Sequence, residues 1–184
     1  MTITNGILSS AIQIHSLHYD CRPNEVDISL LVIHNISLPA GKFGGSYVED
    51  FFVGNLDCEA EPSFKELSGV RVSAHCFIKR NGEVIQFVNF QQRAWHAGQS
   101  EYKGRENCND FSIGIELEGT DTHEYTEAQY KNLAKITKEI LITYPKITNK
   151  NICGHSDIAP DRKTDPGFSF DWQRYLSMIV LITE

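Results

Sequence analysis

Long apolar runs are absent from this chain of 184 residues. No segment approaches the roughly 18 consecutive apolar residues of a membrane-spanning helix, so we expect no membrane partner. Residues 1–17 combine neither a basic start nor an extended apolar stretch, and they do not resemble a secretory signal. Basic residues are also few: 17 against 24 acidic ones give a net charge of −7, which disfavours nucleic acid as a partner.

Cysteines with the spacing of a metal site or a disulfide framework are lacking as well. The five cysteines are an odd number and form no CxxC motif. Together with the missing export signal, this predicts a cytoplasmic protein with reduced thiols. Repeats, low-complexity tracts and linkers are not visible, so we expect a single domain over residues 1–184 and a monomer.

Apolar stretches with strand periodicity recur along much of the chain. Residues 28–34 indicate a buried strand, and residues 72–78 and 84–88 flank an Asn-Gly pair, which is a strong hairpin signal. In residues 111–117, isoleucine and leucine alternate with small or polar residues. This alternation predicts that Glu116 faces away from the apolar side of its strand.

Helical patterns dominate the last third of the chain. Thr126 and Gln129 have the spacing of a capping box, and apolar residues at helical spacing follow until Pro145. Residues 152–155 fit a short last strand, and residues 172–182 fit an amphipathic terminal helix. Strands mixed with helices, including an antiparallel hairpin, predict an α/β fold with a mixed central β-sheet flanked by helices.

Two segments show no clear periodicity. Residues 1–27 indicate irregular structure with a turn near residues 21–24. Residues 35–69 are rich in glycine at their start, and they predict short helices and loops that overlie a site. Weak periodicity also suggests low local stability, so we expect this segment to act as a mobile lid that admits substrate.

The greatest density of reactive side chains lies in residues 153–167. This stretch carries His155, Lys163 and Asp165, and its prolines exclude a continuous helix. His34 ends an apolar run far upstream. Two histidines and a carboxylate from separate segments are the ligand set of a catalytic zinc with one open position for water. The seven histidines of the chain permit many such triads, so these residues alone leave the ligand set open.

Five ordered motifs take the argument further. They are Val32-Ile-His-Asn35, Ser73-Ala-His-Cys-Phe-Ile78, Arg93-Ala-Trp-His-Ala-Gly98, Asn109-Asp-Phe-Ser-Ile-Gly-Ile-Glu-Leu-Glu-Gly-Thr120 and Gly154-His-Ser-Asp-Ile-Ala-Pro-Asp-Arg-Lys-Thr-Asp-Pro-Gly167. Together they closely resemble the cytoplasmic AmpD-type N-acetylmuramoyl-L-alanine amidases of Gram-negative bacteria, within the zinc amidase superfamily of phage lysozyme-type amidases and peptidoglycan recognition proteins. The resemblance runs from about Tyr19 to Leu176, nearly the whole chain.

The resemblance implies a peptidoglycan recognition protein-like fold, a Zn²⁺ cofactor and the roles of five residues. The family's zinc ligands fall on His34, His155 and Asp165, its proton-handling glutamate on Glu116, and its catalytic lysine on Lys163. The family hydrolyses the amide between 1,6-anhydro-N-acetylmuramic acid and L-alanine in muropeptides during cell-wall recycling. In many enterobacteria this recycling also controls induction of a β-lactamase.

The physical chemistry of amide hydrolysis agrees with these roles. An amide carbon is a poor electrophile, so hydrolysis needs a strong nucleophile, which a metal-activated water can supply. We expect Glu116 to take the proton of this water and to pass it to the leaving amine. Lys163, beside the metal loop, would help to stabilise the oxyanion.

Substrate recognition is predicted from residues within or beside the motifs. The stem peptide ends in carboxylates, which guanidinium groups bind well, and this indicates Arg71, Arg105 and Arg162. We expect Trp95 to stack against the anhydro sugar. Asn35, which follows a metal ligand, is expected to hydrogen-bond the lactyl or amide group. The resemblance implies an arginine at the position of Asn107, and this departure puts only a secondary peptide contact in doubt.

Alternatives remain open for several residues. Glu118 shares a strand face with Glu116 and is its rival as the catalytic carboxylate. We assign His75 to the core or to the support of the site, and His96 to the neighbourhood of the site without making it a metal ligand. The other histidines are expected at the surface: His15, His18 and His123.

Two rival functions also follow from the same motifs. The first is a binding module that grips muropeptide without cutting it, but the chain keeps every catalytic position named above. The second is a zinc peptidase or periplasmic amidase that acts on polymeric cell wall, which the missing export signal disfavours.

Overall fold

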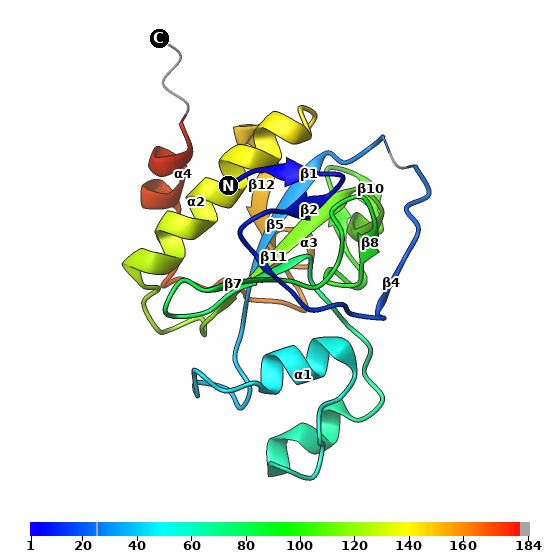
Figure 1. Cartoon of the computed structure of the whole chain (residues 1–184), viewed down its shortest axis with the longest axis vertical. Coiled ribbons are helices and arrows are strands. Elements are labelled where there is room, and N and C mark those ends of the chain that lie inside the picture. Colours follow the sequence, from blue (N-terminus) through cyan, green and yellow to red (C-terminus); the bar gives the residue numbers. More distant parts are fainter. Residues whose placement is uncertain (25, 181–184) are drawn as a thin grey trace.

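The computed structural model describes residues 1–24 and 26–180, and a six-stranded sheet forms its centre (Figure 1). The strand order is β12-β5-β11-β6-β7-β3, with β12, β5, β11 and β6 mutually parallel and β7 antiparallel to β6. This arrangement confirms the predicted mixed sheet flanked by helices. The strands are β3 (Ile12–Gln13), β5 (Leu30–Ile36), β6 (Cys76–Ile78), β7 (Val84–Gln86), β11 (Ser112–Glu118) and β12 (Ile152–Gly154).

Alternation along the two central strands sorts apolar from reactive side chains. Leu31 and Ile33 of β5 lie in the same buried cluster as Ile115 of β11. His34 and Glu116 belong to the other face, and they are direct neighbours in the parallel register. The prediction that Glu116 faces away from the isoleucines of its strand is therefore confirmed. Each fully buried isoleucine or leucine contributes about 1.5–3 kcal/mol, so this register is strongly fixed.

Two helices lie together against the apolar face of the sheet (Figure 1). α2 (Glu127–Thr143) begins at the predicted capping box, in which the Thr126 side chain accepts from Gln129 N. Gln129 Nε2 also donates to the carbonyl oxygens of two strands, at 3.2 and 2.9 Å. α4 (Trp172–Ile179) is shorter than the predicted range 172–182, of which residues 181–182 lie outside the described residues.

The Asn-Gly signal marks a true hairpin between β6 and β7. Gly82 adopts a φ of +87°, which glycine reaches without the steric cost that a side chain would add. β6 begins at Cys76 rather than at residue 72 as predicted. The physical reason is that the Ser73 N–H bonds to Trp95 O at 3.1 Å instead of to a neighbouring strand of the sheet.

Residues 1–24 are more regular than the sequence indicated, and β3 joins the central sheet. The described chain also forms three short antiparallel pairs outside this sheet, two of which include strands from these residues. The expectation that His18 lies at the surface is wrong: it is buried, with Nδ1 3.0 Å from Val72 O. The pairs are β1 (Ile3–Thr4) with β2 (Ile7–Leu8), β4 (Tyr19–Asp20) with β8 (Arg93–Ala94), and β9 (Glu101–Tyr102) with β10 (Arg105–Glu106).

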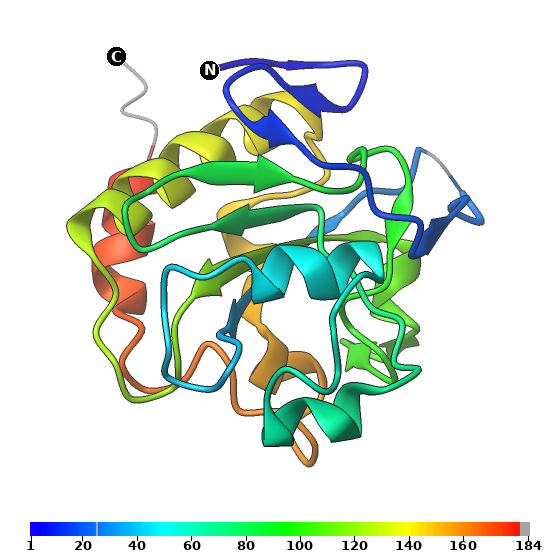
Figure 2. The same cartoon turned by 60° about the horizontal axis from the view of Figure 1, so that its bottom comes forward.

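Short helices occupy the segment after β5, as predicted. The chain leaves the carboxyl end of β5 and continues to α1 (Tyr47–Val53) and the 3₁₀ helix η1 (Pro62–Leu67), which lie beyond that end of the sheet (Figures 1 and 2). α1 buries Phe51 and Phe52 in a second apolar cluster. The mobility of this segment stays a prediction.

The remaining short helices are α3 (His155–Ile158), η2 (Cys108–Asp110) and η3 (Asn149–Asn151). Among the described residues, no helix combines the length and the apolar character that crossing a bilayer requires. The five cysteines form no disulfide in this part of the chain, and Cys76, Cys108 and Cys153 are buried.

Candidate active site

Parallel strands place the candidate ligands at one edge of the sheet. His34 on β5 pairs in register with Glu116 on β11, and Gly154 at the end of β12 pairs with Ile33. His155 follows directly after Gly154. Because the carboxyl ends of neighbouring parallel strands share one edge, side chains that are far apart in sequence meet there.

Local hydrogen bonds hold Asp165 close to His155. Asp157 Oδ2 accepts from the backbone N–H of Gly154 at 2.7 Å, and Gly154 is the N-cap of α3, which begins at His155. The next backbone N–H, of Ser156, donates to Asp165 O at 3.0 Å. The loop that carries Asp165 is therefore tied to the start of the helix that carries His155.

The three candidate ligands converge on one point. His34 Nδ1 lies 3.0 Å from His155 Nδ1, and Asp165 Oδ2 lies 3.1 Å from each of these nitrogens. Tetrahedral zinc with Zn–N bonds of about 2.05 Å sets its donor atoms about 3.3 Å apart. The donor set, two imidazoles and one carboxylate, and the separations therefore fit a zinc ion.

The ionisation states also suit a metal. Burial lowers the pKa of His34 to about 4, so the ring is neutral at pH 7. Burial alone would raise the pKa of Asp165, but hydrogen bonds with His155 and His34 outweigh it and lower this pKa below the usual value. Neutral imidazole and ionised carboxylate are the forms that bind a divalent cation.

The structure separates the two rival carboxylates. Glu116 is 8% exposed, and its Oε2 has no hydrogen-bond partner within the described part of the chain. Burial raises the pKa of Glu116 well above its usual value, and the charge of Asp165 adds to this effect. Both oxygens of Glu118, in contrast, accept backbone N–H groups, from Gly44 and from Arg80. Glu118 therefore holds two loops together, whereas no such bond ties Glu116 Oε2 within the described residues, and the catalytic role of Glu116 stays a prediction.

A cavity of about 290 Å³ opens beside the ligands. Glu116, Lys163, Asn35 and the side chains of His155 and Asp165 line it. The rest of its lining is mostly apolar, a feature that the sequence did not predict. The apolar wall consists of Ile36, Leu38, Phe51, Phe52, Leu67, Val70 and Val72.

Asn35 and Lys163 also line a second, more open cavity of about 560 Å³. Asn35 Nδ2 donates there to Asp121 Oδ1 at 2.9 Å, so the amide orientation is fixed. Asp121 was missed by sequence reasoning, because only the tertiary contact with Asn35 distinguishes it from an ordinary loop aspartate. Arg162 borders this cavity, but its Nη2 donates to Ala97 O and Gln99 O, each at 2.7 Å.

The other residues predicted to bind substrate lie outside the lining of the 290 Å³ cavity. Arg71 is exposed and lines a neighbouring hollow of about 150 Å³, which shares apolar wall residues with that cavity. Trp95 stacks on His18, with ring centroids 6.0 Å apart. Arg105 pairs with Asp27 at 2.7 Å. A role in binding substrate stays a prediction for each of the three.

Comparisons with known proteins agree with the fold and the site. A sequence model of the N-acetylmuramoyl-L-alanine amidase family matches residues 24–168. The chain is 56% identical to the 1,6-anhydro-N-acetylmuramyl-L-alanine amidase AmpD of Escherichia coli (strain K12) over 97% of both chains. A crystal structure of a selenomethionine AmpD derivative superposes with a TM-score of 0.95 at 55% identity, covering 97% of this chain and 99% of that one.

A third relative carries a ligand. It is AmiD of E. coli, solved in complex with anhydro-N-acetylmuramic acid-L-Ala-D-gamma-Glu-L-Lys as substrate. It is 32% identical with a TM-score of 0.61, covering 83% of this chain and 57% of that one. The family match over most of the chain and the full-length identity to AmpD lead to one conclusion: this chain belongs to the N-acetylmuramoyl-L-alanine amidase family.

Proposed function

We propose that this protein hydrolyses the amide bond between 1,6-anhydro-N-acetylmuramic acid and L-alanine in muropeptides, with zinc held by His34, His155 and Asp165. The observation that carries the proposal is the convergence of these three donor atoms beside Glu116. The Oε2 atom of Glu116 has no hydrogen-bond partner in the described residues. The activity named for AmpD supports the choice of substrate. We place the reaction in cell-wall recycling in the cytoplasm.

The metal would supply Lewis-acid activation of a water molecule and of the amide carbonyl. Glu116 accepts the proton of the attacking water, because its buried carboxylate regains a hydrogen-bonding partner and loses an unfavourable charge when it is protonated. The same proton then passes to the nitrogen of the leaving L-alanine. Lys163, which lines the same cavity, stabilises the negative charge that develops on the carbonyl oxygen.

The two sides of the cavity would divide the substrate between them. The apolar wall suits the anhydro sugar, whose locked ring has no free reducing-end hydroxyl. Asn35, oriented by Asp121, offers its oxygen to an N–H group near the scissile bond. Arg71, in the adjoining hollow, is placed to meet a carboxylate of the stem peptide. Arg162 is held by backbone carbonyls, and we assign it mainly to shaping the cavity.

Mass spectrometry of a simple digestion tests the proposal. Purified protein is incubated with anhydromuramoyl-tripeptide, and we expect free anhydro-N-acetylmuramic acid together with the intact tripeptide. Recovery of unchanged substrate from a protein that binds it would instead support a binding module. A parallel incubation with intact sacculi should give far less product, and preferential digestion of sacculi would contradict a role in recycling.

A further inference from the structure

Both histidine ligands contact the same two-residue segment through their second ring nitrogen. His34 Nε2 lies 2.9 Å from His96 Nδ1, and His155 Nε2 lies 3.1 Å from Ala97 O. His96 and Ala97 are consecutive and buried. The orientation of two ligands from distant parts of the sequence therefore depends on one short segment.

The direction of these hydrogen bonds follows from the requirements of a metal ligand. An imidazole that binds metal through Nδ1 carries its proton on Nε2 and must donate it. Ala97 O can only accept, which fits His155. His96 Nδ1 accepts from His34 when the proton of His96 sits on Nε2, which lies 3.0 Å from Ser112 Oγ.

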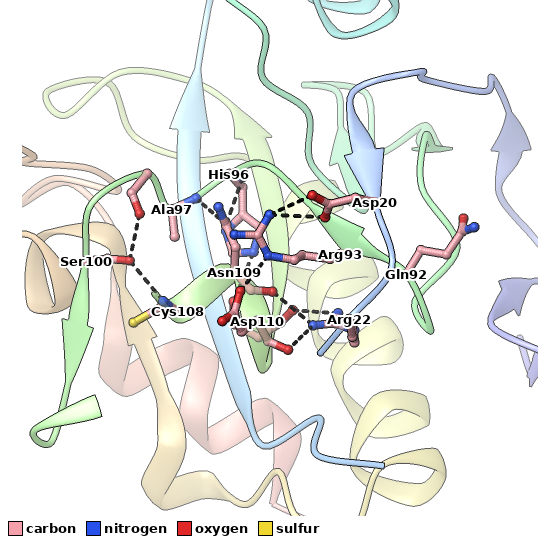
Figure 3. Close-up of polar contacts among 12 residues, drawn as sticks. Asp20, Arg22, Gln92, Arg93, His96, Ala97, Ser100, Cys108, Asn109 and Asp110 are labelled. Atoms are coloured by element: carbon pink, nitrogen blue, oxygen red, sulfur yellow. Dashed lines mark hydrogen bonds and ion pairs between the residues drawn. The ribbon is translucent and has the colours of Figure 1, made fainter. Parts of the chain in front are cut away.

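Asn109 holds the segment in place. Its Oδ1 accepts from both backbone N–H groups, from His96 at 3.1 Å and from Ala97 at 2.8 Å (Figure 3). Asn109 belongs to η2 and is 6% exposed. Removing this oxygen would leave two buried N–H groups without an acceptor, so the segment would have to move.

Space for the His96 ring comes from a glycine in β11. A Cβ atom on Gly114 would lie 2.4 Å from His96 Cγ, which no real contact tolerates. The ring of His75 packs edge-on against His96, with centroids 5.7 Å apart. The ring of His96 is thus confined in position as well as hydrogen-bonded.

We propose that the His96–Ala97 segment, clamped by Asn109, is a positioning element that aims His34 and His155 at the metal. The proposal rests on the zinc site of the proposed function and adds residues that are not themselves metal ligands. It also gives a role to two motifs of the sequence, Arg93–Gly98 and the start of Asn109–Thr120, that the catalytic residues leave largely unused.

Zinc affinity, measured by competition with a chromophoric chelator, tests the proposal. Loss of such outer hydrogen bonds typically costs 10- to 100-fold in metal affinity. We expect a loss of this size in His96→Leu and in Asn109→Leu. His96→Asn keeps an acceptor near the position of Nδ1, so it should recover affinity to within about threefold of the wild type. This recovery separates positioning from mere filling of the core.

Gln86→Met is the matched control. Gln86 is a buried amide whose Oε1 likewise accepts a backbone N–H, from Leu8 at 2.8 Å, but it lies on β7, away from the ligands. This variant should be less stable and yet bind zinc as the wild type does. A weakened zinc affinity in the control, or an unchanged zinc affinity in both leucine variants, would overturn the role of the His96–Ala97 segment and leave the proposed function untouched. A wild-type protein that bound no zinc would overturn the proposed function together with it.

Discussion

Glu116→Gln should raise the stability of the metal-free protein while it removes most of the activity. The wild-type carboxylate is buried, and its Oε2 has no hydrogen-bond partner within the described residues. Glutamine has nearly the same shape and cannot ionise. A residue kept for packing would lose stability on this change, so opposite effects on stability and activity would mark Glu116 as a catalytic group.

The size of the effect follows from the raised pKa. In the unfolded chain the carboxyl titrates near 4.5, whereas burial raises the pKa of Glu116 well above this value in the folded, metal-free protein. The folded state therefore binds more protons above pH 4.5, and wild-type stability falls as pH rises. The fall is about 1.4 kcal/mol per pH unit up to the folded pKa. Between pH 5 and 6, the free energy of unfolding of Glu116→Gln should thus gain on the wild type, by up to about 1.4 kcal/mol.

Urea unfolding of both metal-free proteins at pH 5, 6 and 7 measures this gain. Turnover of the zinc-loaded variant should fall about 100- to 10,000-fold, the usual contribution of a general acid–base group. Glu118→Gln is the matched control, because Glu118 already has two backbone donors and should lose stability at every pH. A gap between Glu116→Gln and wild type that does not change with pH would refute the reasoning.

Three further predictions concern other parts of the protein. Lys163→Met should lower kcat about 100- to 1,000-fold without loss of bound zinc, and normal turnover in a zinc-loaded variant would remove its oxyanion role. Burial, helped by the charge of Arg22, lowers the pKa of His75 from 6.5 to about 3. Below pH 6.5 the unfolded state therefore binds more protons than the folded state, and the free energy of unfolding decreases as the pH is lowered. His75→Gln should therefore lose about 2 kcal/mol less than wild type between pH 7 and 5 in urea unfolding, and equal losses would contradict this. A thiol reagent at pH 8 should modify Cys21 and Cys58 rapidly in the native protein. It should modify Cys76, Cys108 and Cys153 only after unfolding, because these thiols are buried and burial raises their pKa. Rapid reaction of all five thiols in the native protein would contradict this burial.

Local patterns in the sequence predicted the elements that position the site. The alternation around Glu116 assigned the correct face of β11, because strand periodicity depends only on neighbouring residues. The capping box at Thr126 and the Asn-Gly turn before Glu83 are equally local signals, and both are present in the structure. The ligand set needed the family motifs, since periodicity could not choose among seven histidines.

Features that depend on distant contacts were not predictable in this way. His18 is buried because Trp95 stacks on it and Val72 supplies a backbone partner, and neither contact has a trace in the local sequence. The short strands before residue 20 contain too few residues for any period to show. The different hydrogen-bond partners of Glu116 and Glu118 were also not predictable, because the two residues share a strand face and their partners come from distant segments.

Metal analysis combined with turnover shows whether the activity depends on zinc. The purified protein is assayed on anhydromuramoyl-tripeptide as isolated, after chelation, and after zinc is returned. We predict about one zinc per chain, loss of turnover with the metal, and recovery on adding zinc back. Full turnover by protein shown to be free of metal would contradict the account.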